Sequence, residues 1–289
     1  MDENRKAGAL DTGDVRRRFD RAASRFDEAD FVHRQAAAGL FERMSPMLLN
    51  VQRILDAGAA AGHASRALAA KFKSSRIISL DLSLEMLRQA RNSHHRFSRI
   101  AELQANATRL PLVTGSIDLV FANMLLPWSD DIPALFGEIG RVLRKDGLFV
   151  FSSLGPDSLQ ELRQAWQAVD AHEHVNSFVD MHDLGDALVR AGFREPVLDV
   201  DYLTVVYRNC NALFRDLTAS GARNSLRRRR PTLTGKARFN DMRARLEQRF
   251  RDGALPLRLE LVFGHAWGGG AQYPAGEYRL DVSEIRRRR

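Results

Sequence analysis

The chain alternates short apolar segments with helical segments through its first half. Four apolar segments, at residues 54–57, 76–80, 117–122 and 148–151, have the length of buried strands. The clearest helical segment, residues 132–143, repeats its apolar residues at spacings of three and four. Strands that alternate with helices form βαβ units, which build parallel sheets. The sequence therefore predicts an α/β fold with a doubly wound, mostly parallel sheet.

Helical segments flank this alternating region on both sides. Residues 15–47 carry apolar residues at helical spacing, and two more strands are predicted at residues 197–207 and 257–263. We expect one large domain between a flexible leader and a flexible basic tail. The predicted parts are a leader (1–14), a domain (15–268) made of a helical cap (15–50), a core (51–156) and a C-terminal half (157–268), and a tail (269–289).

The sequence carries an excess of positive charge. The 289 residues carry 44 Lys and Arg against 36 Asp and Glu, and four-residue arginine runs occur at residues 227–230 and 286–289. A surface with this net charge of +8 attracts acidic partners. A genome that favours arginine codons would give the same composition on solvated faces, so the charge alone identifies no partner.

The sequence contains no candidate membrane segment or signal peptide. Its apolar runs end well before the ~18 residues of a membrane span, and charges occupy the first 14 residues. Cys210 is the only cysteine, so an internal disulfide cannot form. We therefore expect a cytoplasmic protein with no membrane partner.

A loop of small residues follows the first predicted strand. It lies within ILDAGAAAGHASRAL at residues 54–68, with Asp56 on the strand and Gly58 and Gly62 in the loop. Asp81 follows the second predicted strand, where an acidic side chain commonly binds a ribose diol. A dinucleotide would require G-x-G-x-x-G, which is absent here. S-adenosylmethionine has a ribose but no phosphate, so this pattern favours it as the cofactor.

Four successive motifs resemble those of class I S-adenosylmethionine-dependent methyltransferases. They read LDAGAAAG, SLDLSLEMLRQAR, LPLVTGSIDLVFANMLLPW and IGRVLRKDGLFVFSSLGPDSLQELRQAW. The flanking segments are similar to the malonyl-acyl-carrier-protein O-methyltransferases of biotin synthesis. These segments are RRRFDRAASRFDEADFVHRQ before the core, and GPDSLQELRQAW, HVNSFVDMHDLGDALVRAGF, LTGKARF and LRLELVFGHAW after it. The resemblance covers roughly residues 15–268, and its C-terminal motifs are more specific than those of the core.

The resemblance implies a set of residues around the cofactor. The methionine portion would be surrounded by Asp56, Gly58 and Gly62, and the ribose hydroxyls would be held by Asp81. The adenine would lie beside Leu82, Met86, Asn106 and Ala107. The transferable methyl group would be bordered by Asn123 and Leu125.

The chain departs from the family pattern at three positions. Ala60 stands where the loop usually has its middle glycine, Asn106 where the adenine edge usually has Asp, and Phe26 where the N-terminal motif usually has Tyr. An alanine is tolerated if its φ is negative and strained if its φ is positive. Asn106 keeps an acceptor oxygen, whereas Phe26 removes a hydroxyl near the expected substrate.

The implied reaction requires no general base and no metal. A malonyl carboxylate is already ionised at pH 7, so alignment and desolvation can supply most of the rate. We therefore assign no catalytic residue, and neither H-E-x-x-H nor CxxC is present. A substrate carboxylate needs donors, and the arginines that could supply them are Arg18, Arg21, Arg34 and Arg163.

The resemblance implies methyl transfer to the free carboxylate of malonyl-acyl carrier protein, and the acidic carrier protein as partner. Its expected docking surface comprises Arg223, Arg227, Arg228, Arg229, Arg230, Lys236 and Arg238. The alternative is a degenerate or hydroxylase-like relative that acts in respiratory-complex assembly. A nucleic acid methyltransferase is not favoured, because the chain has no N-P-P-Y-like motif and no aromatic residues within its basic runs. We expect a monomer.

Overall fold

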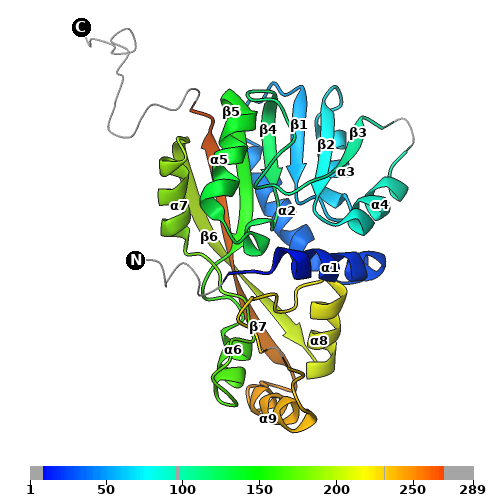
Figure 1. Ribbon diagram of the computed structural model, residues 1–289, viewed down its shortest axis with the longest axis vertical. Coiled ribbons are helices and arrows are strands. Elements are labelled where there is room, and N and C mark those ends of the chain that lie inside the picture. The colour runs from blue at the N-terminus through cyan, green and yellow to red at the C-terminus, as the bar shows by residue number, and fades with distance from the viewer. Residues whose placement is uncertain (1–8, 96–97, 231, 270–289) are drawn as a thin grey trace, which may run out of the picture.

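Seven strands form one sheet in the computed structural model, which describes residues 9–95, 98–230 and 232–269. The sheet has the order β3-β2-β1-β4-β5-β7-β6 (Figure 1). Strands β1 to β5 pair in parallel, whereas β7 is antiparallel to both of its neighbours. The strands are β1 (Arg53–Ala57), β2 (Arg76–Asp81), β3 (Ile100–Gln104), β4 (Ile117–Ala122), β5 (Leu143–Leu154), β6 (Arg194–Tyr207) and β7 (Leu255–Trp267). The predicted doubly wound, mostly parallel α/β sheet is confirmed.

Helices cover both faces of the sheet, so its central strands are buried on both sides. In β4, Val120 packs towards α5 and α7, whereas Leu119 and Phe121 pack towards α2 and α3. Successive side chains of a strand point to opposite faces, and this explains why these strands read as continuous apolar runs. The helices around the core are α2 (Phe31–Met44), α3 (His63–Lys71), α4 (Leu84–Asn92), η2 (Leu126–Trp128), α5 (Ile132–Val142) and α7 (Met181–Arg190).

The N-terminal part differs from its prediction in two ways. The helical pattern of residues 15–47 is divided among α1 (Thr12–Ala22), the 3₁₀ helix η1 (Ala23–Glu28) and α2. The flexible leader predicted for residues 1–14 is also wrong from residue 9 onwards, because Leu10 is buried and bridges Leu226. The side chain of Asp11 caps α1 by accepting a hydrogen bond from the Asp14 N–H at 2.9 Å. Apart from Gly269, the predicted tail lies outside the described residues.

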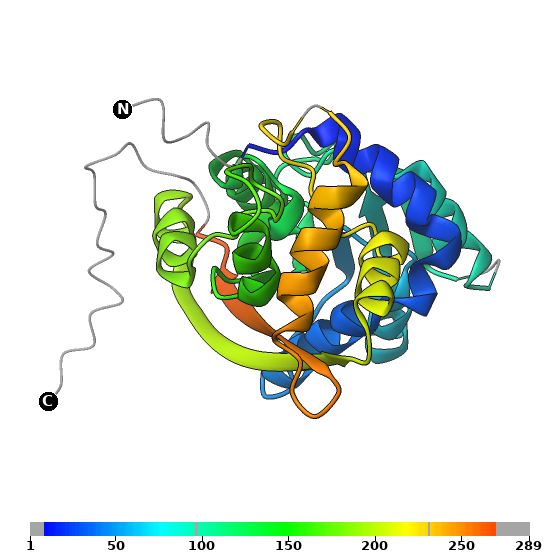
Figure 2. The same ribbon diagram turned by 90° about the horizontal axis from the view of Figure 1, so that it is seen from below.

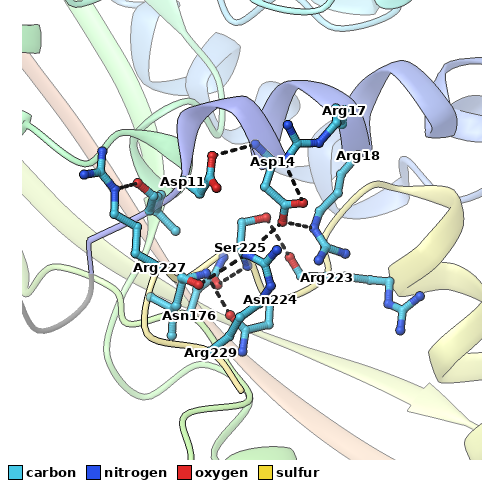
Figure 3. Close-up of polar contacts among 12 residues, drawn as sticks. Asp11, Asp14, Arg17, Arg18, Asn176, Arg223, Asn224, Ser225, Arg227 and Arg229 are labelled. Atoms are coloured by element: carbon cyan, nitrogen blue, oxygen red, sulfur yellow. Dashed lines mark hydrogen bonds and ion pairs between the residues drawn. The ribbon is translucent and has the colours of Figure 1, made fainter. Parts of the chain in front are cut away.

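Helix α1 lies across the end of the sheet, beside the C-terminal part of the chain (Figure 1). Asp14 on α1 binds the Arg18 guanidinium at 2.7 Å and that of Arg229 at 3.1 Å (Figure 3). Arg227 donates a hydrogen bond to the Leu10 carbonyl at 2.8 Å. These contacts join α1 to the loop of residues 221–230, although the two are separated by about two hundred residues of chain.

Strands β6 and β7 extend beyond the rest of the sheet and support a second cluster of helices. These are α6 (Gln160–Gln167), α8 (Cys210–Ala219) and α9 (Lys236–Glu247), which lie close together when the molecule is viewed from below (Figure 2). Trp166, Leu213 and Met242 from the three helices share one apolar core with the ends of β6 and β7. No helix of the described chain is both long enough and apolar enough to cross a bilayer.

Candidate functional site

Two adjoining cavities lie beyond the carboxyl ends of β1, β2 and β4. The first, which we call the strand-edge cavity, has a volume of about 80 Å³ and runs from Gly58 past Asp81 to Asn106, beneath α1. The second, the loop cavity, has a volume of about 30 Å³ and is enclosed by the loop after β1, by η1 and by the start of α2. The carboxyl edge is where open α/β sheets bind ligands.

The loop after β1 is held close to the end of β2. The N–H groups of Gly58 and Ala59 both donate to the Leu80 carbonyl, and the Ala60 N–H donates to the Asp81 carboxylate at 2.9 Å. A Cβ at Gly62, where φ is +76°, would lie 2.8 Å from the Ala90 Cβ. The turn therefore requires glycine at residue 62 for both its backbone conformation and its space.

Ala60 adopts a left-handed backbone. Its φ is +46°, a region in which a Cβ is crowded and where glycine is the common residue. The alanine that replaces the usual glycine at residue 60 therefore strains the backbone of the loop. The strain is compensated by the hydrogen bond from its N–H to Asp81, which holds the loop in this conformation.

Asp56 is a buried carboxylate with one unused oxygen. Its Oδ2 accepts a hydrogen bond from the Ser65 hydroxyl at 2.5 Å, whereas its Oδ1 is buried without a partner. Burial raises the pKa of Asp56 to about 7; the Ser65 hydrogen bond opposes this shift, and the nearby charge of Asp81 adds to it. Because Asp56 lines the loop cavity, its free oxygen can accept a hydrogen bond from a cationic ligand there.

Asp81 is held in place by backbone donors. It accepts hydrogen bonds from the Ala60 N–H and from the Ser83 N–H at 2.8 Å, and it lines the strand-edge cavity. Burial raises the pKa of Asp81 to about 6, against the lowering effect of the backbone donors at Ser83, Ala60 and Leu82. A carboxylate has about four acceptor positions, so Asp81 keeps acceptor capacity for a hydroxyl group of a ligand. Asp56 and Asp81 therefore fit a ligand with a cationic amino group and a diol.

The far end of the strand-edge cavity is formed by Leu82, Asn106 and Ala107. The Asn106 Oδ1 accepts a hydrogen bond from the Thr108 N–H at 3.0 Å, which fixes the turn and the position of the amide. The Leu82 carbonyl accepts from the Gln104 side chain at 3.1 Å. These residues thus form a rigid wall, and their contact with an adenine stays a prediction.

Two of the nine predicted residues line neither cavity. Met86 is completely buried among Ala22, Phe26 and Ala61, where it supports α1 and η1 from below. Gly62 precedes α3 and shapes the loop. The other predicted residues all line the strand-edge cavity, the loop cavity or both.

The Asn123 side chain makes two hydrogen bonds within the protein. Its Nδ2 donates to the His33 carbonyl at 2.9 Å, and its Oδ1 accepts from the Ser152 hydroxyl at 2.8 Å. Asn123 therefore ties the start of α2 to the ends of β4 and β5. The next residue, Met124, has a left-handed backbone with φ of +57°, which marks a constrained turn beside the cavity.

His33 is a site residue that sequence reasoning missed. It lines the strand-edge cavity, the loop cavity and a third, apolar cavity of about 90 Å³ between α2 and the ends of β6 and β7. Its Nδ1 is buried without a hydrogen-bond partner, and the Phe26 ring packs on the imidazole at 5.0 Å. Burial lowers its pKa to about 4 against the charge of Asp30, so the ring is neutral. The sequence around a lone histidine in a helical segment does not indicate that its side chain will line a cavity.

The four arginines predicted for a substrate carboxylate lie in different surroundings. Arg18 is bound to Asp14, and Arg34 donates to the Asp30 carboxylate at 2.8 Å. Arg163 donates to the carbonyls of Val175 and Asn176, and Arg21 is exposed on α1. Within the described residues, no arginine or lysine lines the strand-edge cavity or the apolar cavity. The same residues hold no group of three or more His, Cys, Asp or Glu arranged for a metal.

Comparison with known proteins agrees with the fold. The profile of the family "Methyltransferase domain" matches residues 55–151, which span β1 to β5 and thus the loop and both carboxylates. The YcgJ protein of Bacillus subtilis has a similar structure, with a TM-score of 0.60 and 16% identity over 81% of this chain and 99% of that one. The fold is therefore that of a class I methyltransferase.

Relatives of higher identity define the family more narrowly. The chain is 45% identical to the malonyl-[acyl-carrier protein] O-methyltransferase of Methylovorus sp., over 89% of both chains. It is 40% identical to the protein of the same name from Gallionella capsiferriformans, over 89% of this chain and 91% of that one. The chain belongs to the malonyl-[acyl-carrier protein] O-methyltransferase family, as the sequence motifs predicted.

The strain at Ala60 gives a testable prediction. Ala60→Gly should raise the free energy of unfolding by about 1 kcal/mol, because relief of the left-handed Cβ outweighs the extra chain entropy of glycine. The measurement is urea unfolding, with Ala59→Gly as control. Ala59 is buried and lacks a positive φ, so this control should be destabilised. A loss of stability in Ala60→Gly would contradict the interpretation.

The burial of Asp56 gives a second prediction. Since its folded pKa of about 7 lies above the ordinary 3.8, the folded protein binds the proton more tightly, and stability falls as pH rises through this window. Asp56→Asn removes this dependence. Its free energy of unfolding relative to the wild type should increase by on the order of 2 kcal/mol between pH 5 and pH 8. Urea unfolding at four pH values tests this, and a constant difference would refute it.

Proposed function

We propose that the protein transfers a methyl group from S-adenosylmethionine to the free carboxylate of malonyl-acyl carrier protein, giving the malonyl methyl ester. The observation that carries this proposal is the 45% identity to a malonyl-[acyl-carrier protein] O-methyltransferase over 89% of both chains. The proposal includes the start of biotin synthesis, the role that the sequence motifs implied.

The two carboxylates provide the main support for the cofactor. The free Oδ1 of Asp56 would accept a hydrogen bond from the amino group of the methionine portion, and Asp81 would hold the ribose hydroxyls. Gly58 allows the backbone to approach the methionine portion, and Leu82, Asn106 and Ala107 would border the adenine. The bound cofactor supplies an electrophilic methyl group on a positively charged sulfur.

The chain's own contribution to the reaction is alignment and exclusion of water. The substrate carboxylate is ionised at neutral pH, so no residue has to remove a proton. Helix α1 covers the strand-edge cavity through Val15 and Phe19, and the Phe19 ring meets the Trp128 ring edge-on at 5.0 Å. A covered, apolar surrounding favours the approach of a carboxylate to a sulfonium, because the two opposite charges cancel during the reaction.

A route for a substrate on a long arm leads away from the cofactor. The apolar cavity shares Met124 and Trp128 with the strand-edge cavity, and it shares Leu154 and Leu159 with a larger outer cavity of about 750 Å³. The outer cavity lies between α6, α8 and the loop of residues 221–230. This succession of cavities suits an acyl group that enters from a carrier protein at the surface.

Internal ion pairs narrow the expected docking surface. Arg227 binds Asp130 at 3.3 Å, Arg229 binds Asp14 at 3.1 Å, and Arg230 lies 3.9 Å from Asp170. Reversing these charges would disturb the fold as well as docking. The exposed cations around the outer cavity that form no ion pair within the described residues are Arg223, Arg228, Lys236 and Arg238. We assign the contact with the acidic carrier to these four.

The alternative of a degenerate relative in respiratory-complex assembly has less support. The two cavities retain Asp56 and Asp81, the loop keeps Gly58 and Gly62, and Ala60 keeps the loop bonded to Asp81 despite its strain. The curated relatives that match most of the chain bear the name of an active methyltransferase.

The cofactor and the reaction can be tested together. We expect calorimetry to show that S-adenosylmethionine binds with micromolar affinity or better, and a radiolabelled methyl group to pass to malonyl-acyl carrier protein. Asp81→Ala should weaken cofactor binding by about tenfold or more, because the ribose hydroxyls lose the charged carboxylate that would accept their hydrogen bonds. Absence of both binding and transfer in the wild type would refute the proposed enzyme and favour the assembly role.

The docking surface has its own test. Arg223→Glu combined with Arg228→Glu should raise the KM for malonyl-acyl carrier protein by about tenfold or more at low salt, with little change in kcat, because these cations steer and hold an acidic partner. The control combines Lys73→Glu and Arg76→Glu, which change the net charge equally at the opposite end of the sheet. Equal KM values in the two double variants would contradict the assignment.

A further inference from the structure

We propose that His33 is the neutral hydrogen-bond donor that orients the substrate carboxylate for methyl transfer. This inference rests on the proposed function and adds a specificity-determining residue to it. Its basis is the place of His33 between the cofactor and substrate cavities, together with a ring nitrogen that nothing in the protein satisfies.

His33 lies where the cavities meet. Of the described residues, it alone lines the strand-edge cavity, the loop cavity and the apolar cavity. The apolar cavity and the strand-edge cavity share His33, Met124 and Trp128, so a carboxylate that moves from one to the other passes beside the imidazole. Tyr207 and Asp216 also line the apolar cavity, but neither reaches the strand-edge cavity.

The ring has an unused hydrogen-bonding position. The buried Nδ1 has no partner, and an unsatisfied buried polar atom of this kind is uncommon unless a ligand completes it. A neutral imidazole has one N–H donor and one acceptor nitrogen, so the tautomer protonated at Nδ1 offers a donor. The low pKa of His33 agrees with a neutral ring at physiological pH.

One hydrogen bond holds the backbone of His33, and one aromatic contact holds its ring. The backbone carbonyl of His33 accepts the Asn123 Nδ2–H, and Asn123 is in turn bound by Ser152. The Phe26 ring packs on the imidazole at an interplanar angle of 62°. A donor held in this way can orient a carboxylate without first having to be ordered itself.

A neutral donor suits this reaction better than a cation. One carboxylate oxygen forms a bond to the methyl carbon while the carbon–sulfur bond breaks, its electron pair stays on sulfur, and no proton is transferred. The carboxylate therefore loses its negative charge on the way to the transition state. A cation bound to it would stabilise the starting state more than the transition state and slow the reaction. The described linings of the strand-edge cavity and the apolar cavity contain no lysine or arginine, and Arg34, which lines the loop cavity, is paired with Asp30.

Trp128 is the competing donor. It lines both the strand-edge cavity and the apolar cavity, and its indole N–H could also reach a carboxylate. Trp128 also lines the wide outer cavity, whereas His33 does not. The test must therefore separate these two side chains.

The experiment compares two carriers on the complete protein saturated with S-adenosylhomocysteine, which cannot react. Malonyl-acyl carrier protein has the free carboxylate, and acetyl-acyl carrier protein lacks it. We expect the wild type to bind the malonyl form more tightly, and His33→Phe to lose this preference by about tenfold or more. His33→Gln, which keeps an N–H donor, should retain most of the preference, as should Trp128→Phe and the exposed-site control His172→Phe.

A second measurement does not depend on any variant. The ring nitrogens of His33 in the wild type, labelled with ¹⁵N, should report a neutral ring and should shift on addition of the malonyl carrier but not of the acetyl carrier. Equal shifts with both carriers would overturn the proposal. Loss of preference in Trp128→Phe but not in His33→Phe would also overturn it, in favour of the indole.

The outcomes separate this inference from the proposed function. If the wild type methylates the malonyl carrier and His33→Phe keeps the full binding preference, only the role of His33 is refuted. If the wild type neither methylates nor prefers the malonyl carrier, the proposed function fails, and the role of His33 fails with it.

Discussion

The strand-edge cavity depends on the hydrogen bond from the Ala60 N–H to the Asp81 carboxylate. This bond joins the loop after β1 to the end of β2, and the Ser83 N–H holds the same carboxylate from the start of α4. The loop must bend sharply to make the bond, which explains the left-handed backbone at Gly58, Ala60 and Gly62. The wall of the cavity is thus fixed by the fold, and the hydrogen bond to Asp81 holds Ala60 in its strained conformation.

Two buried carboxylates beside this loop explain what the cavity is suited to bind. Asp56 and Asp81 each have a raised pKa because burial disfavours their charge; the charge of Asp81 adds to the shift of Asp56, and that of Asp20 adds to the shift of Asp81. Such an arrangement lowers the stability of the free protein at neutral pH. Residues that cost stability in this way are typical of binding sites, where a ligand of opposite charge compensates them. The family relationship is consistent with a positively charged cofactor in this role.

The arginines show why charge counted along the sequence is a poor guide to function. Residues 227–230 read as one continuous basic surface, yet Arg227, Arg229 and Arg230 face carboxylates of distant segments. Their role is structural: Arg227 and Arg229 hold the start of α1 against the loop of residues 221–230, and Arg230 holds this loop against the segment after α6. Only Arg228 in this run remains exposed and without an ion pair in the described structure, and it shares that state with Arg223.

Local pattern determined the fold class and most of the cofactor site. The strands and helices from residue 54 to residue 151 follow from apolar spacing, because that spacing must match the period of the buried face. The positions of Asp56 and Asp81 follow from the strands that precede them, since parallel strands bring their carboxyl ends to one edge. The positive φ of Ala60 was beyond sequence reasoning, because it depends on the distance the loop must bridge.

Long-range contacts decided the rest. The bridge of Leu10 to Leu226 orders a segment whose own composition predicted a flexible leader. Asn123 lines the strand-edge cavity and the loop cavity and is bound to His33 and Ser152, and His33 gains its place only because α2 packs against the ends of β4 and β5. The sequence by itself determined which residues end the strands. Only the tertiary structure decided which side chains remain free to act, because pairing between distant segments leaves no periodic signal in the chain.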